Sequence, residues 1–158
     1  MVETLTNKTE FYSALLAQTK ALIAQESDVI ANMANISALL FEHLDEVNWV
    51  GFYRLVDNEL VLGPFQGKVA CIRIPLSKGV CGAAAITQEV QRVADVHQFS
   101  GHIACDASTN AEIVLPVIVN NSVVAVLDID SQSFSRFDEA DQQGLQAIVD
   151  VFSQQISK

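Results

Sequence analysis

A strand that is apolar on both of its faces constrains this fold more than any other feature. Residues 122–129 form that strand, with Val124 and Val126 on one face and Val123, Ala125 and Leu127 on the other. A strand of this kind is central and buried in its sheet. Asn120-Asn121 separates it from residues 112–119, which predicts an apolar antiparallel hairpin.

The rest of the chain supplies helices and further strands around this hairpin. Helical spacing of apolar residues predicts helices over 10–24, 28–43 and 138–154, and a glycine opens a shorter one over 79–87. β-Branched and aromatic residues predict strands over 47–56, 59–65, 70–74 and 91–94, followed by an irregular loop over 95–109. The order indicates an α+β fold with a central, mostly antiparallel sheet and the N- and C-terminal helices packed on one face.

Length and charge limit the classes of protein and partner. The 158 residues fit one domain, residues 1–158, with a single core. A net charge of −10 repels phosphate backbones and anionic lipids, so we expect neither a nucleic acid nor a membrane partner. No apolar run reaches the roughly 18 residues of a membrane span. The first residues lack the basic start and apolar core of a signal peptide, which predicts a cytoplasmic protein.

Three cysteines are the first candidates for chemistry. An odd number of thiols in a cytoplasmic chain indicates reduced cysteines or a transient disulfide. Cys105 lies in the loop segment 101–106 (GHIACD), and loops expose functional side chains, so it is the best reactive candidate. Cys81 follows Lys78 near a helix start, where the dipole and a cation lower a thiol pKa. Cys71 and Cys81 fit equally well as small apolar residues of the core.

The ligand types would also allow zinc to be held by Cys71, Cys81, Cys105 and His102. Structural zinc sites usually supply their cysteines as close Cys-x₂₋₄-Cys pairs. No two cysteines of this chain are that close. We therefore expect no metal and favour thiol redox chemistry.

Carboxylates follow the cysteine loop on the two strands of the hairpin. Asp128 and Asp130 are two residues apart on one strand and share a face, either as a strand end in solvent or as a polar pocket. With a simple two-residue turn, Glu112 faces Ile129 and points away from both aspartates. A one-residue bulge or a longer turn would bring the three carboxyl groups together and raise at least one pKa. The sequence does not decide between these registers.

Two aromatic residues lie four positions apart on the strand over 47–56. Trp49 and Tyr53 therefore point to the same face. Ordinary core packing is one interpretation. The other is an aromatic wall for a small apolar group such as a methyl or a thioether.

Seven motifs, in order and with consistent spacing, resemble the free methionine-(R)-sulfoxide reductases, which are stand-alone GAF-type domains. They are residues 48–53 (NWVGFY), 62–67 (LGPFQG), 79–82 (GVCG), 95–97 (DVH), 101–106 (GHIACD), 112–116 (EIVLP) and 127–131 (LDIDS). No single motif is decisive, but the ordered set is highly specific. The resemblance implies a GAF-like domain whose substrate is free methionine-(R)-sulfoxide.

The resemblance also implies roles for the cysteines. Cys105 matches the nucleophile, which attacks the sulfoxide sulfur and becomes a sulfenic acid. Cys71 matches the resolving cysteine, and Cys81 matches a third cysteine of less settled role. The disulfide that results is reduced by thioredoxin, so no cofactor is needed.

The same match assigns substrate contacts. Trp49 and Tyr53 correspond to residues that bind the methyl group. Glu112, Asp128 and Asp130 correspond to residues that hold the sulfoxide oxygen and the ammonium group. Backbone N–H groups near Ile103 and Ala104 would take the carboxylate. A homodimer is compatible with the sequence, and a non-catalytic GAF sensor that binds a small ligand is the alternative function.

Overall fold

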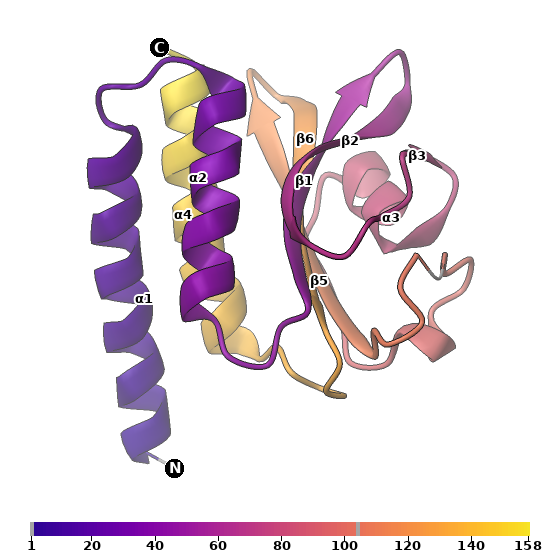
Figure 1. The fold of residues 1–158 in the computed structure, drawn as a ribbon, viewed down its shortest axis with the longest axis horizontal. Coiled ribbons are helices and arrows are strands. Elements are labelled where there is room, and N and C mark those ends of the chain that lie inside the picture. Colours follow the sequence, from indigo (N-terminus) through magenta and orange to yellow (C-terminus); the bar gives the residue numbers. More distant parts are fainter. Residues whose placement is uncertain (1, 104) are drawn as a thin grey trace.

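A six-stranded antiparallel sheet forms the centre of the molecule, and helices cover both of its faces (Figure 1). The computed structural model describes residues 2–103 and 105–158, and side chains from residue 7 onward. The strands lie in the order β3-β2-β1-β6-β5-β4. Their bounds are β1 (Trp49–Val56), β2 (Glu59–Gly67), β3 (Arg73–Pro75), β4 (Gln91–Val93), β5 (Ala111–Val119) and β6 (Ser122–Ser131).

Three long helices lie on one side of the sheet, α1 (Val2–Ile23), α2 (Val29–His43) and α4 (Glu139–Ile156). α2 packs on β1 and β2, α4 packs on β5, and α1 packs outside them, mainly on α4. α3 (Gly79–Thr87) covers the other face, and a 3₁₀ turn, Val96–Gln98, follows β4. The predicted α+β layer fold is therefore confirmed, with the terminal helices on one face.

Side chains at the helix starts explain where α2 and α4 begin. The Asp28 side chain accepts a hydrogen bond from the Ala31 N–H at the start of α2. Asp138 and Asp141 form a reciprocal capping box at the start of α4. The Tyr12 hydroxyl of α1 donates a hydrogen bond to Asp141 at 2.7 Å, so α1 also contacts the N-terminal end of α4. These contacts fix the helical layer on its side of the sheet.

Two predicted boundaries are wrong. α1 begins at Val2 and not at residue 10, and Lys8 in this added stretch forms ion pairs with Asp138 and Asp141 at the start of α4. β3 pairs with β2 through three residues only, so Cys71 precedes this edge strand and does not lie in it. Both errors come from tertiary contacts that the local pattern does not contain.

The hairpin of β5 and β6 contains the bulge that the sequence left open. Ile118 pairs with Val123 but Val117 pairs with Ala125, so Val124 is an extra residue on β6. Val124 packs with the helical layer, and the prediction that it shares a face with Val126 is wrong. Beyond the bulge every residue of β6 is displaced by one position relative to β5.

Each face of the sheet has its own apolar core. One lies between the sheet and the three long helices, and the other lies between the sheet and α3. β5 is buried along most of its length, as expected for a strand covered on both faces. Among the described helices, none combines the length and the apolar character needed to cross a bilayer.

Candidate active site

The bulge places three carboxyl groups on the α3 face of the sheet, near the end of the central strands. Glu112 of β5 lies directly opposite Asp130 of β6, and Asp130 lies opposite Trp49 of β1. One row further, Asp128 lies between Gly51 and Val114. Directly opposed residues share a face, so the strand pairing alone gathers these side chains.

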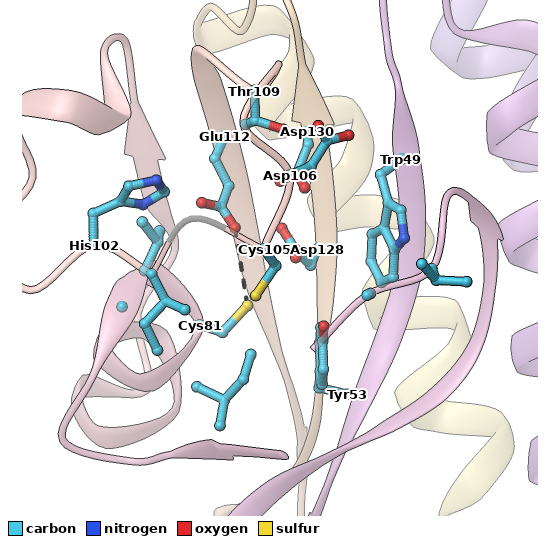
Figure 2. A pocket seen from close by; sticks show the side chains of 16 residues that line it. Trp49, Tyr53, Cys81, His102, Cys105, Asp106, Thr109, Glu112, Asp128 and Asp130 are labelled. Atoms are coloured by element: carbon cyan, nitrogen blue, oxygen red, sulfur yellow. Dashed lines mark hydrogen bonds between the residues drawn. The ribbon is translucent and has the colours of Figure 1, made fainter. Parts of the chain in front are cut away.

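A cavity lies above these rows, closed by α3 and by the loops on either side (Figure 2). Its walls include most of the residues singled out in the sequence: Trp49, Tyr53, Cys81, Ile103, Cys105, Glu112, Asp128 and Asp130. Asp128 and Asp130 lie in the middle of the view, with Glu112 on one side of them and Trp49 on the other. The acidic and aromatic side chains therefore line adjacent parts of one cavity on the same face of the sheet, which suits a small molecule with both characters.

The aromatic wall is a stack of rings on β1 and β2. Trp49 stacks on Tyr53 with ring centroids 5.8 Å apart, and on Phe65 with centroids 5.1 Å apart. A Cβ atom at Gly51 would lie 2.7 Å from the Trp49 ring and 2.3 Å from the Phe65 Cβ. Only glycine therefore leaves room for the indole to lie flat across the sheet.

The carboxyl groups are buried and incompletely paired. Asp128 is 5% exposed, and one oxygen each of Asp128 and Asp130 is buried without a hydrogen-bond partner among the described residues. Burial, and then the charges of the neighbouring carboxylates, raises the pKa of Asp128 well above its usual range. Burial and Glu112 do the same to the pKa of Asp130. The site therefore keeps a proton to a higher pH than an ordinary carboxyl group does, and its buried oxygens can accept a hydrogen bond from a cation or an N–H donor.

Cys71 and Cys105 are joined by a disulfide, with their Cα atoms 5.5 Å apart. Cys105 lines the cavity, whereas Cys71 lies just outside it in the connection between β2 and β3. The Tyr53 hydroxyl donates to the Cys71 carbonyl at 3.0 Å, and the Trp49 indole N–H donates to the Lys68 carbonyl at 3.1 Å. The aromatic wall thus holds the segment that carries Cys71.

Cys81 is a free, buried thiol in the first turn of α3. Its Sγ donates a long hydrogen bond, 4.0 Å, to Oε2 of Glu112. Burial, and then the charges of Asp128 and Glu112, raises the pKa of Cys81 well above its usual value. The expectation that the helix start and Lys78 lower this pKa is wrong, because the nearby carboxylates and the loss of water outweigh the helix dipole.

Two sets of potential metal ligands arise from these residues. The zinc set of Cys71, Cys81, Cys105 and His102 is not available as four ligands, because two of its sulfurs are bonded to each other. Cys81, Glu112 and Asp128 each have a ligand atom within 4.8 Å of the others. The Cys81 thiol would have to lose a proton that its surroundings hold tightly, so this trio fits protonated, hydrogen-bonded groups better than a metal.

The cavity also contains residues that the sequence reasoning did not assign. Asp106 and Thr109 line it, together with His102, which the sequence suggested only as a zinc ligand. The Asn48 amide donates to Asp106 and Thr109 at 3.1 Å each. Hydrogen bonds from Ser108 lower the pKa of Asp106. The Asp-x-Ser spacing at Asp106 is the signal that could have predicted this ordered turn. Ala104, one of the expected substrate contacts, lies outside the described residues.

Asp128→Asn is expected to stabilise the protein by about 1 kcal/mol near neutral pH. Because the pKa of Asp128 is raised, the native state keeps a proton that the unfolded chain releases. Native stability therefore falls as the pH rises from about 4 toward that raised pKa, and a neutral amide removes this loss. Urea unfolding at about pH 5 and about pH 7.5 should show the larger gain at the higher pH.

An exposed aspartate on α4 is the matched control. Asp150→Asn should change the free energy of unfolding by less than about 0.5 kcal/mol at either pH. A gain for Asp128→Asn that is equal at both pH values, or larger at the lower one, would contradict the raised pKa.

Comparisons with known proteins agree with this geometry. A family model described as a GAF domain matches residues 31–157. The free methionine-R-sulfoxide reductase of Escherichia coli is 57% identical over 143 residues, which cover 90% of this chain and 87% of that protein.

Two solved structures with bound substrate share the fold. The fRMsr of Staphylococcus aureus in complex with substrate has a TM-score of 0.88 at 50% identity, covering 92% of this chain and 95% of that one. The free methionine-R-sulfoxide reductase of Neisseria meningitidis in complex with its substrate has a TM-score of 0.91 at 38% identity, covering 94% and 90%. The similarity therefore extends over almost the whole chain, including the cavity.

Proposed function

Because this chain belongs to the free methionine-R-sulfoxide reductases, a family built on the GAF domain, we propose that it reduces free L-methionine-(R)-sulfoxide to methionine. The observation that supports this most directly is the Cys71–Cys105 disulfide in the wall of a cavity lined by buried carboxyl groups and stacked aromatic rings. A disulfide at that place is the oxidised product that such a reaction leaves behind.

The reaction starts from the reduced cysteines. The Cys105 thiolate attacks the sulfoxide sulfur, a proton reaches the sulfoxide oxygen, methionine leaves, and Cys105 carries the oxygen as a sulfenic acid. Cys71 then attacks the Cys105 sulfur and water leaves, which forms the disulfide. Two electrons pass from the two thiols to the substrate, so the enzyme must be reduced before the next turnover.

The aromatic and the acidic parts of the cavity bind different groups on the reacting sulfur. Trp49 and Tyr53 contact the S-methyl group, since apolar carbon and sulfur pack well against ring faces. Asp128 and Glu112 act on the sulfoxide oxygen, because a carboxyl group with a raised pKa donates a proton to an oxygen that becomes more basic. Cys81 keeps Glu112 in position through its hydrogen bond.

The amino-acid part of the substrate needs contacts of its own. Asp130 has a buried oxygen that no described residue hydrogen-bonds, and this oxygen can accept a hydrogen bond from the substrate ammonium. We further propose that backbone N–H groups near Ile103 and Ala104 bind the carboxylate; of these two residues, Ile103 lines the cavity. A site that binds both the ammonium and the carboxylate accepts the free amino acid and rejects a methionine sulfoxide residue inside a peptide.

We propose that residues 1–158 act as one domain, in the cytoplasm, with thioredoxin as the reductant. A homodimer is compatible with the proposal, because every group that it uses comes from one chain.

A coupled assay tests the proposed function. With thioredoxin, thioredoxin reductase and NADPH, oxidation of NADPH should follow addition of free L-methionine-(R)-sulfoxide and not of the S epimer, because only one epimer can direct its methyl to Trp49 and its oxygen to Asp128. The N-acetylated R epimer, which lacks the ammonium group, should be a poor substrate. Equal turnover of the two epimers, or none with either, would refute the assignment and favour a non-catalytic sensor.

A further inference from the structure

The connection between β2 and β3 differs in charge from the rest of the chain. Residues 60–88 contain Lys68, Arg73 and Lys78 and no aspartate or glutamate, a local charge of +3. Since the whole chain carries −10, the remaining residues carry −13. Arg73 is already paired with Glu59 of β2. The positive charge of this segment that no described ion pair offsets is therefore that of Lys68 and Lys78, and it attracts an acidic partner to the side of the disulfide that holds Cys71.

The same connection exposes large apolar side chains. Val69 is 90% exposed and Ile72 is 69% exposed, and together they flank Cys71 in the chain. Lys68 and Arg73, the next residues outward, are exposed as well, and Arg73 forms an ion pair with Glu59. An exposed apolar pair with a basic residue on each side, beside a reactive bond, has the composition of a protein-binding surface and not of a solvated loop.

We propose that residues 68–73 are the docking surface for the protein that reduces the Cys71–Cys105 disulfide, a small acidic dithiol protein of the thioredoxin type. This inference rests on the proposed function, which requires two electrons from outside in every cycle. Thiol–disulfide exchange needs the incoming sulfur in contact with the sulfur it attacks. A protein partner that reaches Cys71 must therefore cover the residues on both sides of it.

The structure also favours one of the two sulfurs as the point of attack. Cys105 and Val69 line the substrate cavity, whereas Cys71 and the exposed Ile72 that follows it do not. A partner thiolate attacks Sγ of Cys71, a mixed disulfide forms, and Cys105 leaves as a thiolate. The second thiol of the partner then attacks the partner's first sulfur in the mixed disulfide, and Cys71 leaves as a thiolate. The partner becomes oxidised and both cysteines of this chain are reduced.

Kinetics with two reductants test the docking surface. Ile72→Ser should raise KM for thioredoxin about five- to tenfold, as expected when a buried interface residue is truncated. Ile72→Asp should raise it further by repelling an acidic partner. Turnover supported by dithiothreitol, which needs no protein surface, should stay within about twofold of wild type. Ile30→Ser on α2, an equally apolar site 48% exposed on the helical layer, is the control and should change neither value.

Each outcome has a separate meaning. If dithiothreitol supports no reduction of the sulfoxide by wild type, the proposed function fails. If it supports turnover but the Ile72 variants keep a wild-type KM for thioredoxin, the docking surface is refuted while the function stands.

A trapping experiment checks the point of attack. Thioredoxin with its second active-site cysteine replaced by serine cannot complete the exchange, so the mixed disulfide accumulates. Peptide mapping by mass spectrometry should find thioredoxin on Cys71. A bond to Cys105 would overturn the proposed direction of approach.

Discussion

Cys105→Ser is expected to abolish even a single turnover of free L-methionine-(R)-sulfoxide, whereas Cys71→Ser should release one methionine per chain and then stop. A hydroxyl at position 105 is not ionised near neutral pH and cannot attack the sulfoxide sulfur. Without Cys71 the sulfenic acid still forms on Cys105, but it is not resolved to a disulfide. Methionine released per chain, counted by chromatography without added reductant, measures both variants.

Cys81→Ser is the matched control for this pair. Cys81 is buried and hydrogen-bonded to Glu112, so it does not supply a thiolate. The Cys81→Ser protein should therefore still release one methionine per chain and form the Cys71–Cys105 disulfide. A Cys81→Ser protein that releases none, together with an active Cys105→Ser protein, would refute these roles while leaving the reaction itself in place.

Asp128→Asn is expected to lower kcat about 100-fold although it stabilises the fold. The raised pKa of Asp128 keeps a proton available for the departing oxygen, and an amide cannot deliver it. In wild type the rate should fall as the pH rises through that pKa, because the acid form is lost. The variant should lack this decline. Single-turnover rates with excess enzyme, measured between about pH 5 and about pH 9, separate the chemical step from recycling.

Asp150→Asn, on the exposed side of α4, should leave both the rate and its pH profile unchanged. A variant at Asp128 that keeps the wild-type rate would remove this carboxyl group from the chemistry. A variant that is slower but retains the wild-type decline with pH would assign the proton to another group of the cluster.

The strands of the β5–β6 hairpin could be predicted from the local sequence pattern, but their register could not. The apolar runs on either side of Asn120-Asn121 were enough to predict both strands and their turn. The simple register paired Glu112 with Ile129, and the bulge at Val124 pairs it with Asp130 instead. An extra residue in a strand that is apolar on both faces leaves no mark in the hydropathy pattern, because either face accepts it.

The direction in which the pKa of Cys81 shifts could not be predicted from the sequence either. Its place at a helix start indicated a lowered pKa, and that inference used only neighbours in the chain. The carboxyl groups that raise it come from β5 and β6, 31 residues or more away in the sequence. Electrostatic surroundings in a buried site depend on which strands lie opposite, and a sequence segment does not contain that information.

By itself, the sequence determined the layered α+β fold, the helices on one face and, through its ordered motifs, the family. Those features depend on side-chain periodicity, capping residues and the spacing of short motifs, which are local. Only the tertiary structure decided that Glu112 joins Asp128 and Asp130, that Cys71 and not Cys81 is bonded to Cys105, and that the segment beside Cys71 is exposed. These depend on distances between residues far apart in the chain, which strand register and loop packing set together.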